Sequence, residues 1–275
     1  MSQKTESIFL RAITCSAAAL TVGTLLFLIA YILIRGIPNL NPGLFAWVYN
    51  TENVSMMPAI INTISMTVLS LLIAVPMGIG SAVYLVEYAK RGSRLVELIR
   101  LTTETLSGIP SIIYGLFGYL LFVIQLGFGY SLLGGACTLS IMILPLIMRT
   151  TEEALRAVPD LFREGSFGLG AGKLRTIFAI VLPASIPGIL AGIILAIGRI
   201  VGETAALIYT SGTIAGVPDS VMGSGRTLAI HMYVLTNEGL YTNQSYATAV
   251  ILLFIVCGIN AFSALIAKHL AAASS

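Results

Sequence analysis

The sequence predicts an all-α polytopic membrane protein with six transmembrane helices and both termini in the cytoplasm. Hydrophobic residues make up 57% of the 275-residue chain and charged residues 10%, whereas about a quarter of an ordinary soluble protein is charged. The apolar residues occur in long blocks separated by short charged stretches, as in a chain that crosses a bilayer repeatedly. Lysine and arginine are concentrated in alternate loops, which the positive-inside rule places in the cytoplasm.

The first apolar run extends from Ala12 to Ile34 and follows Lys4 and Arg11. The apolar part of a signal peptide is only about 7 to 15 residues long, so we expect this longer run to be retained as a helix. Residues 1–57 are therefore assigned to an N-terminal transmembrane helix and an external loop.

Charge-free stretches mark the remaining spans. They cover residues 53–86, 105–148, 176–198, 204–218 and 239–267. The second stretch is long enough for two helices joined by a glycine-rich turn near residues 127–135. The third and fourth stretches complete the six spans if they share one helix from about Pro187 to Thr210, because proline suits the first turn of a helix. That helix would place Arg199 and Glu203 inside the membrane.

The basic residues agree with this count. With the amino terminus inside, the cytoplasmic segments contain Lys4, Arg11, Lys90, Arg91, Arg94, Arg100, Arg149, Arg156, Arg163, Lys173, Arg175 and Lys268, and the external segments contain Arg35 and Arg226. A five- or seven-span count would break this asymmetry at the carboxyl end. We therefore expect residues 87–104 and 149–175 in the cytoplasm, with an amphipathic helix of the first loop lying on the inner leaflet.

Arg199 and Glu203 are the principal candidates for a substrate pathway. Their i, i+4 spacing puts both on one helix face, and a helix that begins near Pro187 would carry Arg199 about 18 Å into a ~30 Å core. Ionisable groups at that depth are usually paired and mark a pathway. Two plainer interpretations stay open, namely a helix over residues 176–198 that leaves the pair at the surface, and a structural ion pair.

These two side chains favour an oxyanion as cargo. The guanidinium of Arg199 can donate two parallel hydrogen bonds to the oxygens of a carboxylate, sulfate or phosphate. Glu203 would repel a fully ionised anion but can accept a hydrogen bond from an anion that keeps a proton. The pair therefore indicates a protonated oxyanion such as phosphate.

The second cytoplasmic loop is rich in glycine. Pro159 can start a short helix and the glycines of residues 165–172 can end it, so we expect a short helix and a sharp turn that project into the cytosol. Phe167 and Leu169 would then be exposed without a partner, which a simple connector does not explain.

The order of residues in this loop follows a known pattern. After Arg163 come Glu164, Gly165 and Ser166, then three residues and Gly170, then nine residues and Ile180, then one residue before Leu182 and Pro183. The pattern resembles the Glu-Ala-Ala loop of ABC-importer permeases, with glycine and serine in place of the two alanines. In that family the loop forms coupling helices that dock into a groove on the ATPase subunits.

Two further stretches narrow the resemblance. Residues 106–117 read LSGIPSIIYGLF and residues 197–205 read IGRIVGETA, and both resemble the phosphate-importer permeases. The run over residues 202–208 is more similar to the PstA type than to the PstC type. The resemblance covers essentially the whole chain as far as Lys268.

This resemblance implies a MetI-like, type I importer fold, in which one extra helix precedes a permease domain over residues 58–268 and a short cytoplasmic tail, 269–275. Arg199 matches an arginine on the phosphate path of the family, and Glu203 its nearby acid. The implied partners are a PstC-like permease in a heterodimer, two PstB-like ATPase subunits, a PstS-like external phosphate-binding protein and membrane lipid. The implied mechanism is alternating access in the cytoplasmic (inner) membrane of a prokaryote.

Glycine pairs on the predicted Arg199 helix favour close helix packing. Gly188 with Gly192, and Gly198 with Gly202, are each four residues apart. Such small residues let a second helix approach closely, either at a subunit interface or within the chain.

The chain lacks the residue types of an enzyme site. Two histidines and three isolated cysteines cannot supply a metal centre or a catalytic triad, and no basic tail suggests nucleic acid. Lys173 comes closest to a nucleotide-binding lysine, but Leu174 stands where Ser or Thr is required. We therefore expect no metal or cofactor here, with ATP and Mg bound by a separate ATPase. The alternatives are a permease for molybdate, sulfate or phosphonate, a stand-alone secondary transporter or channel, and a membrane enzyme.

Overall fold

A computed structural model describes residues 3–90 and 92–273, and every regular element in those residues is helical. The α-helices are α1 (Gln3–Gly36), α2 (Met57–Val83), α3 (Arg94–Ser107), α4 (Ser111–Gly118), α5 (Leu132–Ala157), α6 (Asp160–Gly168), α7 (Lys173–Thr176), α8 (Leu182–Val201), α9 (Ala205–Thr210), α10 (Leu228–Glu238) and α11 (Thr242–Ala273). The short 3₁₀ turns η1 (Ile37–Asn39) and η2 (Pro42–Phe45) follow α1. The π-helical segments are η3 (Tyr84–Tyr88), η4 (Tyr119–Gln125) and η5 (Ile177–Val181). The predicted all-α class is confirmed.

Five helical segments of the described chain are long and apolar enough to cross a membrane. They are Leu10–Asn39, Met57–Tyr88, Leu132–Ala157, Lys173–Val201 and Thr242–Phe262. A sixth span is formed if α3 and the α4–η4 segment, which meet at a bend of 101°, cross together. The predicted count of six spans is confirmed on that basis, with one span broken.

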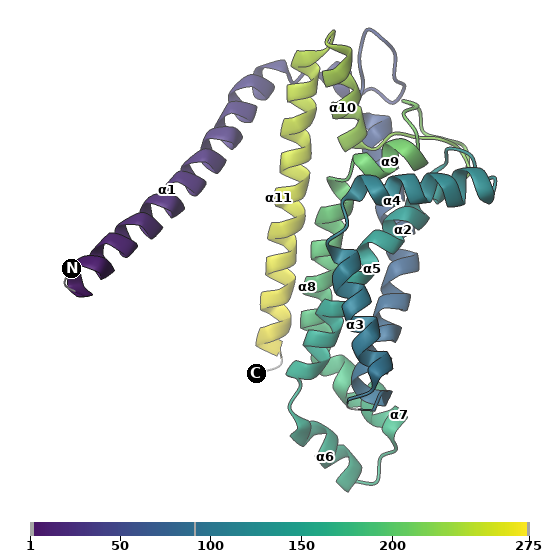
Figure 1. Cartoon of the computed structure of the whole chain (residues 1–275). Coiled ribbons are helices and arrows are strands. Elements are labelled where there is room, and N and C mark those ends of the chain that lie inside the picture. The colour runs from purple at the N-terminus through teal and green to yellow at the C-terminus, as the bar shows by residue number, and fades with distance from the viewer. Residues whose placement is uncertain (1–2, 91, 274–275) are drawn as a thin grey trace.

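Helix α5 lies at the centre of the bundle (Figure 1). In the most apolar 18-residue stretch of α5, 67% of the residues are buried within the protein, whereas none are buried in the corresponding stretch of α1. The difference arises because α2 and α8 pack along α5, and α3 and α4 also contact it. Ile143 and Ile147 of α5 meet Met66 of α2 and Ile200 of α8 in the largest apolar cluster. The central helix thus contacts α3, α4, α8 and α9, the four helices on either side of the chain breaks between α3 and α4 and between α8 and α9.

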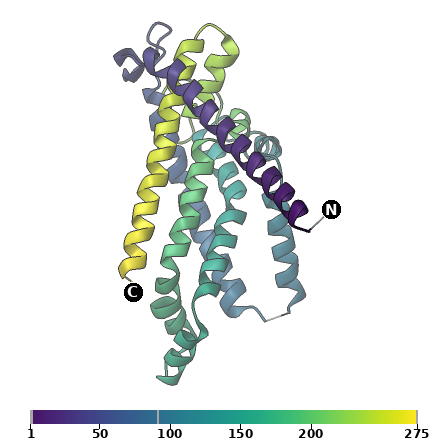
Figure 2. The same cartoon turned by 90° about the vertical axis from the view of Figure 1, so that its left-hand side faces the viewer.

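Helix α1 diverges from the bundle toward its N-terminus (Figures 1 and 2). Its C-terminal end packs against α11, where Gly36 lies so close to Tyr246 and Val250 that a Cβ atom would overlap both. Tyr31 meets Tyr246 edge-on, with ring centroids 5.9 Å apart. At the other end of the chain, α11 continues to Ala273 through most of the predicted tail, and residues 274 and 275 lie outside the described residues.

The predicted helix from Pro187 to Thr210 is wrong. One helical segment runs over Lys173–Val201, and Thr210 ends the separate helix α9. Pro183 is the second residue of α8, one position after the π-helical η5 passes into it at Leu182. The changed hydrogen-bond pattern at this junction accommodates a residue without an N–H. Pro187 lies inside α8, and the helical segment already begins at Lys173, so neither proline marks the start of the span.

Helix α3 also differs from the expected surface helix. It stands beside α5 (Figure 2), and its Val96 is buried in a cluster with Leu155 of α5. The chain then turns sharply before Pro110, since proline lacks an N–H and disfavours a helical conformation at the preceding residue. The Tyr114 hydroxyl donates a hydrogen bond of 2.7 Å to the carbonyl of Leu106, which stabilises this corner.

Candidate functional site

Two broken helices meet near the middle of the molecule. The chain breaks between α3 and α4 and again between α8 and α9, and α4 packs against α9 (Figure 1). A Cβ atom on Gly115 would lie 2.8 Å from the Cα of Ala206, so glycine is needed for this approach. The two stretches that resemble phosphate-importer permeases are therefore neighbours. Breaks of this kind expose backbone polar groups at membrane depth and commonly form substrate sites.

Arg199 and Glu203 lie on either side of the second break. Arg199 is exposed in the last turn of α8, whereas Glu203 is half-buried in the connection to α9. One carboxylate oxygen of Glu203, Oε1, accepts a hydrogen bond of 3.1 Å from the backbone N–H of Ala206, at the start of α9. In the described chain no ion pair joins the two side chains. The predicted i, i+4 pair is therefore wrong, because the helix ends between its members.

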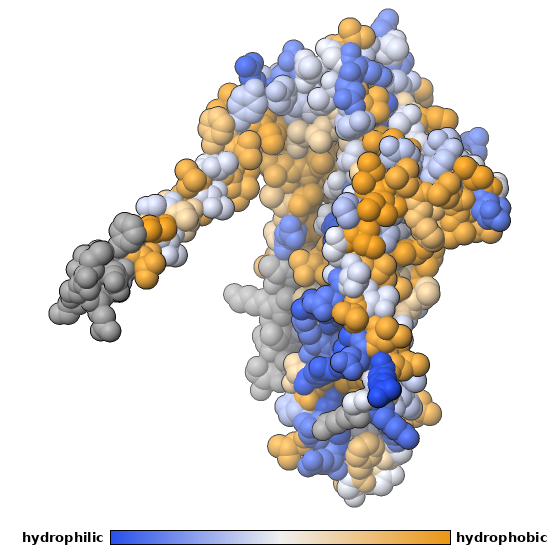
Figure 3. Space-filling model, viewed as in Figure 1, coloured by the Kyte–Doolittle hydropathy of each residue, from blue (hydrophilic) through white to orange (hydrophobic). Residues whose placement is uncertain are grey.

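Arg199 instead faces a cavity of about 590 Å³ between α3 and α5. The charged residues that line it are Arg100, Glu104, Arg149, Glu152, Glu153, Arg156 and Arg199. Figure 3 shows hydrophilic residues gathered over the lower part of α3 and α5, below a hydrophobic area over α4. Hydropathy analysis missed this cavity, because it assigned the charges of α3 to a loop.

The segment with α6 and α7 forms one end of the molecule (Figures 1 and 2). α6 follows Pro159 directly, and the turn after it has a left-handed residue, Gly170, with φ of +80°. The predicted short helix and sharp turn are confirmed. Leu161 is 76% exposed and Leu169 is 91% exposed, and both line a groove of about 490 Å³. An apolar, grooved tip of this kind is typical of a protein-binding surface.

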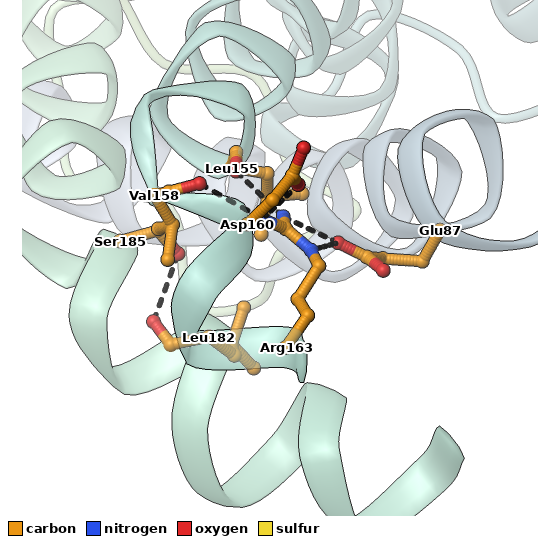
Figure 4. Close-up of polar contacts among 7 residues, drawn as sticks. All are labelled: Glu87, Leu155, Val158, Asp160, Arg163, Leu182 and Ser185. Atoms are coloured by element: carbon orange, nitrogen blue, oxygen red, sulfur yellow. Dashed lines mark hydrogen bonds and ion pairs between the residues drawn. The ribbon is translucent and has the colours of Figure 1, made fainter. Parts of the chain in front are cut away.

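Arg163 holds α6 in place (Figure 4). Its Nε and Nη2 atoms donate hydrogen bonds of 3.1 and 2.7 Å to Oε1 of Glu87 in η3. The guanidinium also donates to the carbonyls of Leu155, at 3.0 Å, and Val158, at 2.8 Å. These carbonyls belong to the end of α5, where no later turn of helix can satisfy them. Arg163 was predicted as part of the coupling loop, but Glu87, 76 positions away, gave no signal in the sequence pattern.

The remaining residues of the loop pattern divide between surface and interior. Glu164 and Gly165 are exposed on α6, and the space beside Gly165 is open. Ser166 is buried and shares a hydrogen bond of 2.8 Å with the hydroxyl of Thr176, which ties α6 to α7. Further along, Ile180 and Leu182 are half-buried and Pro183 is exposed.

The four glycines of α8 and its end have different surroundings. Gly188 and Gly192 face α5, where added Cβ atoms would overlap Ala154 and Thr150. Gly198 has open space beside it, and Gly202 forms the end of α8. The first pair therefore serves packing within the chain.

A second group of polar residues is buried at the opposite end of the molecule, around α10. His231 is fully buried and meets the ring of Tyr49 edge-on, with centroids 6.2 Å apart. The guanidinium of Arg226 lies 4.7 Å from the centre of the same Tyr49 ring. Burial, reinforced by the charge of Arg226, lowers the pKa of His231 to about 3, so this histidine is neutral at physiological pH.

Residues 74–273 match the family described as binding-protein-dependent transport system inner membrane component. The chain therefore belongs to this family, whose members are the membrane subunits of ABC importers, and is a multi-pass membrane protein. It is 37% identical over 211 residues to the phosphate transport system permease protein PstA 1 of Mycobacterium tuberculosis (strain CDC 1551 / Oshkosh), a match that covers 76% of this chain and 69% of that protein. The PstA protein of Yersinia pestis is 38% identical over 207 residues, which cover 73% of this chain and 69% of that protein. The resemblance to PstA-type permeases is confirmed.

Solved structures agree on the fold. A bacterial alginate ABC transporter matches with a TM-score of 0.69 at 16% identity, over 96% of each chain. The MetNI methionine ABC transporter matches with a TM-score of 0.58 at 18% identity, over 88% of this chain and 97% of that one. The predicted MetI-like permease fold is confirmed.

Proposed function

We propose that this chain is a permease subunit of an ATP-driven importer of inorganic phosphate. The observation that carries the proposal is the position of Arg199, exposed in a cavity beside two helix breaks, in a chain whose relatives include PstA permeases. Arginine at a discontinuous helix suits a tetrahedral oxyanion, since its planar donors match two of the oxygens. Phosphate would pass Arg199 on its way through the membrane.

Glu203 lies at the second break and not on the cavity wall, and we infer that it meets the protonated form of the same ligand there. Its Oε1 atom is already held by the N–H of Ala206, which leaves the second oxygen free to accept a hydrogen bond from a phosphate hydroxyl. Sulfate is fully ionised at neutral pH and offers no such hydroxyl. The site therefore favours phosphate over sulfate, because only phosphate has a hydroxyl that can donate a hydrogen bond to Glu203.

The tip formed by α6 and α7 docks on the ATPase. Its exposed apolar residues and groove give a partner a surface to bury, and the Glu-Ala-Ala pattern lies on it. ATP with Mg is bound and hydrolysed by two PstB-like subunits, so this chain has no catalytic step of its own. A PstC-like permease completes the pathway, and a PstS-like protein delivers phosphate from outside.

The charge distribution supports an orientation with both termini in the cytoplasm of a prokaryote. Arg94, Arg163, Lys173 and Arg175 belong to the segments at the α6 end of the molecule, and positive residues favour the cytoplasmic side. A secondary transporter or channel would have no use for an exposed apolar tip at that end.

Transport by purified, reconstituted complexes tests the proposal. Vesicles that contain this chain with its partners should accumulate labelled phosphate when ATP is supplied, and sulfate or molybdate should compete poorly. Arg199→Ala should abolish uptake while assembly and ATPase binding persist, and Arg35→Ala, on α1, should have no effect. Selective uptake that survives Arg199→Ala would remove the arginine from the path. Uptake of molybdate or sulfate in place of phosphate would assign the chain to another oxyanion.

Docking of the ATPase has its own matched pair of variants. Leu169 on the tip is 91% exposed, and Leu240, which follows α10 at the other end, is 80% exposed. Leu169→Asp should abolish copurification of the ATPase because it puts a charge into the proposed apolar contact, and Leu240→Asp should leave it intact. Equal behaviour of the two variants would place the docking surface elsewhere.

A further inference from the structure

Two arginines in the cavity converge on one buried carboxylate. Nη2 of Arg100 on α3 and Nη2 of Arg156 on α5 each lie 2.7 Å from the same atom, Oε1 of Glu152. The Glu152 side chain is 11% exposed, whereas the two arginines are 41% and 53% exposed. The carboxylate is thus covered by two guanidinium groups that remain accessible from the cavity.

The bonding of Arg100 is incomplete. Its Nε atom is buried and has no hydrogen-bond partner among the described residues, although Nη2 on the same edge contacts Glu152. The Nε–Nη2 edge of a guanidinium is shaped for two oxygens in parallel, and Glu152 supplies one. An oxyanion with several oxygens could use the unfilled donor and reach Arg156 as well.

The cavity carries an excess of positive charge. Arg149 and Glu153 form an exposed pair at 3.1 Å and balance each other. The lining as a whole has four arginines and three glutamates, and Arg199 has no carboxylate partner in the described chain. An anion inside the cavity therefore finds a favourable field at both ends.

The converging arginines lie between Arg199 and the α6 end of the molecule. The part of α5 that lines the cavity runs from Met142 to Arg156, which corresponds to about 20 Å along a helix at 1.5 Å per residue. Arg156 lies in the last turn of α5, directly before α6. An anion that leaves Arg199 toward α6 meets this group next.

We propose that Arg100 and Arg156 form a second oxyanion site, which the carboxylate of Glu152 occupies when the site is empty of ligand. This inference rests on the proposed function, because the ligand is the same class of tetrahedral oxyanion. An arriving anion displaces Glu152 from the arginines, and Glu152 displaces the anion in turn. The competition keeps binding weak, as a site on an exit path requires.

Binding of labelled phosphate to the purified complex in nanodiscs tests this site, alongside uptake. Glu152→Gln removes the competing charge, so we expect phosphate to bind about tenfold more tightly and uptake to slow. The matched control is Glu153→Gln, which removes one carboxylate from the same cavity but leaves Glu152 on the two arginines. Because Arg149 and Glu153 are both largely exposed to solvent, the control should change the phosphate affinity far less than Glu152→Gln does. Native-like phosphate affinity in Glu152→Gln would overturn the proposal.

Arg100→Lys keeps the positive charge but removes the pair of parallel hydrogen-bond donors. It provides a second test of the site if the Glu152→Gln variant does not assemble. In combination with Glu152→Gln it should return the affinity to the native level or below, and alone it should weaken phosphate binding. The second site would be overturned if Arg100→Lys changed the phosphate affinity neither on its own nor in combination with Glu152→Gln.

The two proposals fail separately. A native complex that takes up no phosphate refutes the proposed function, and the phosphate affinities of Glu152→Gln and Glu153→Gln still decide whether the arginines bind an oxyanion. Phosphate uptake with no difference between those variants refutes the second site alone.

Discussion

Loss of Arg163 should destabilise the protein far more than loss of an exposed arginine. Arg163→Met keeps an apolar stem but strands the carboxylate of Glu87, whose side chain is 9% exposed, and two carbonyls at the end of α5. Removal of one member of a buried ion pair costs about 3–5 kcal/mol, and the orphaned carbonyls add to this. We therefore expect a loss of about 4 kcal/mol.

The control for this prediction is Arg149→Met. That residue forms one ion pair, with Glu153, and both side chains are about two-thirds exposed (64% and 66%), so its loss should cost about 0–1 kcal/mol. Unfolding of each variant in mixed detergent micelles, followed by circular dichroism, measures both values. The double variant Arg163→Met with Glu87→Met should recover part of the loss, because no charge is left buried. Equal destabilisation by Arg163→Met and Arg149→Met would refute the assigned role of the buried pair.

Two further predictions follow from packing and from pH. Gly192→Val should lower stability by about 1–3 kcal/mol because its Cβ would overlap Thr150, whereas Gly198→Ala has open space; equal melting temperatures would contradict the packing. The pKa of His231 is about 3 in the folded protein and about 6.5 in the unfolded chain. The free energy of unfolding therefore does not depend on this histidine above about pH 6.5, and it falls by about 1.4 kcal/mol per pH unit as the pH drops from there toward 3. His231→Phe should flatten that part of the melting curve against pH, and an unaltered slope would exclude this histidine as its source.

Hydropathy predicted the spans well and their ends poorly. The thickness of the bilayer sets how long an apolar segment must be to cross it, so the spans can be counted without knowing which residues contact one another. The end of α8 depends instead on how Glu203 bonds to Ala206 in the next helix. The prolines gave a wrong helix start for a related reason, since the junction between the π-helical η5 and α8 accommodates Pro183 inside the span. Hydrogen bonds of this kind leave no periodic signal.

The candidate site shows the same division. Arg199 was found because a charge interrupts an apolar run, and the α6 segment because proline and glycine restrict the backbone locally. Glu152 and Glu87 were missed, because each acquires its role from an arginine on another element, Arg100 on α3 and Arg163 on α6. A single sequence carries no record of contacts between distant positions.

The ion pairs of Glu87 and of Glu152 lie at the same end of α5, and this links the tip formed by α6 and α7 to the cavity. Arg163 binds the carbonyls of Leu155 and Val158, while Glu152, one turn earlier on the same helix, holds Arg100 of α3. A partner that displaces α6 must either break the contacts of Arg163 or move the end of α5 with it. Breaking them leaves the carboxylate of Glu87 unpaired, whereas keeping them requires η3, which carries Glu87, to move together with the end of α5. We therefore expect a displacement of the tip to change the separation of Arg100 and Arg156.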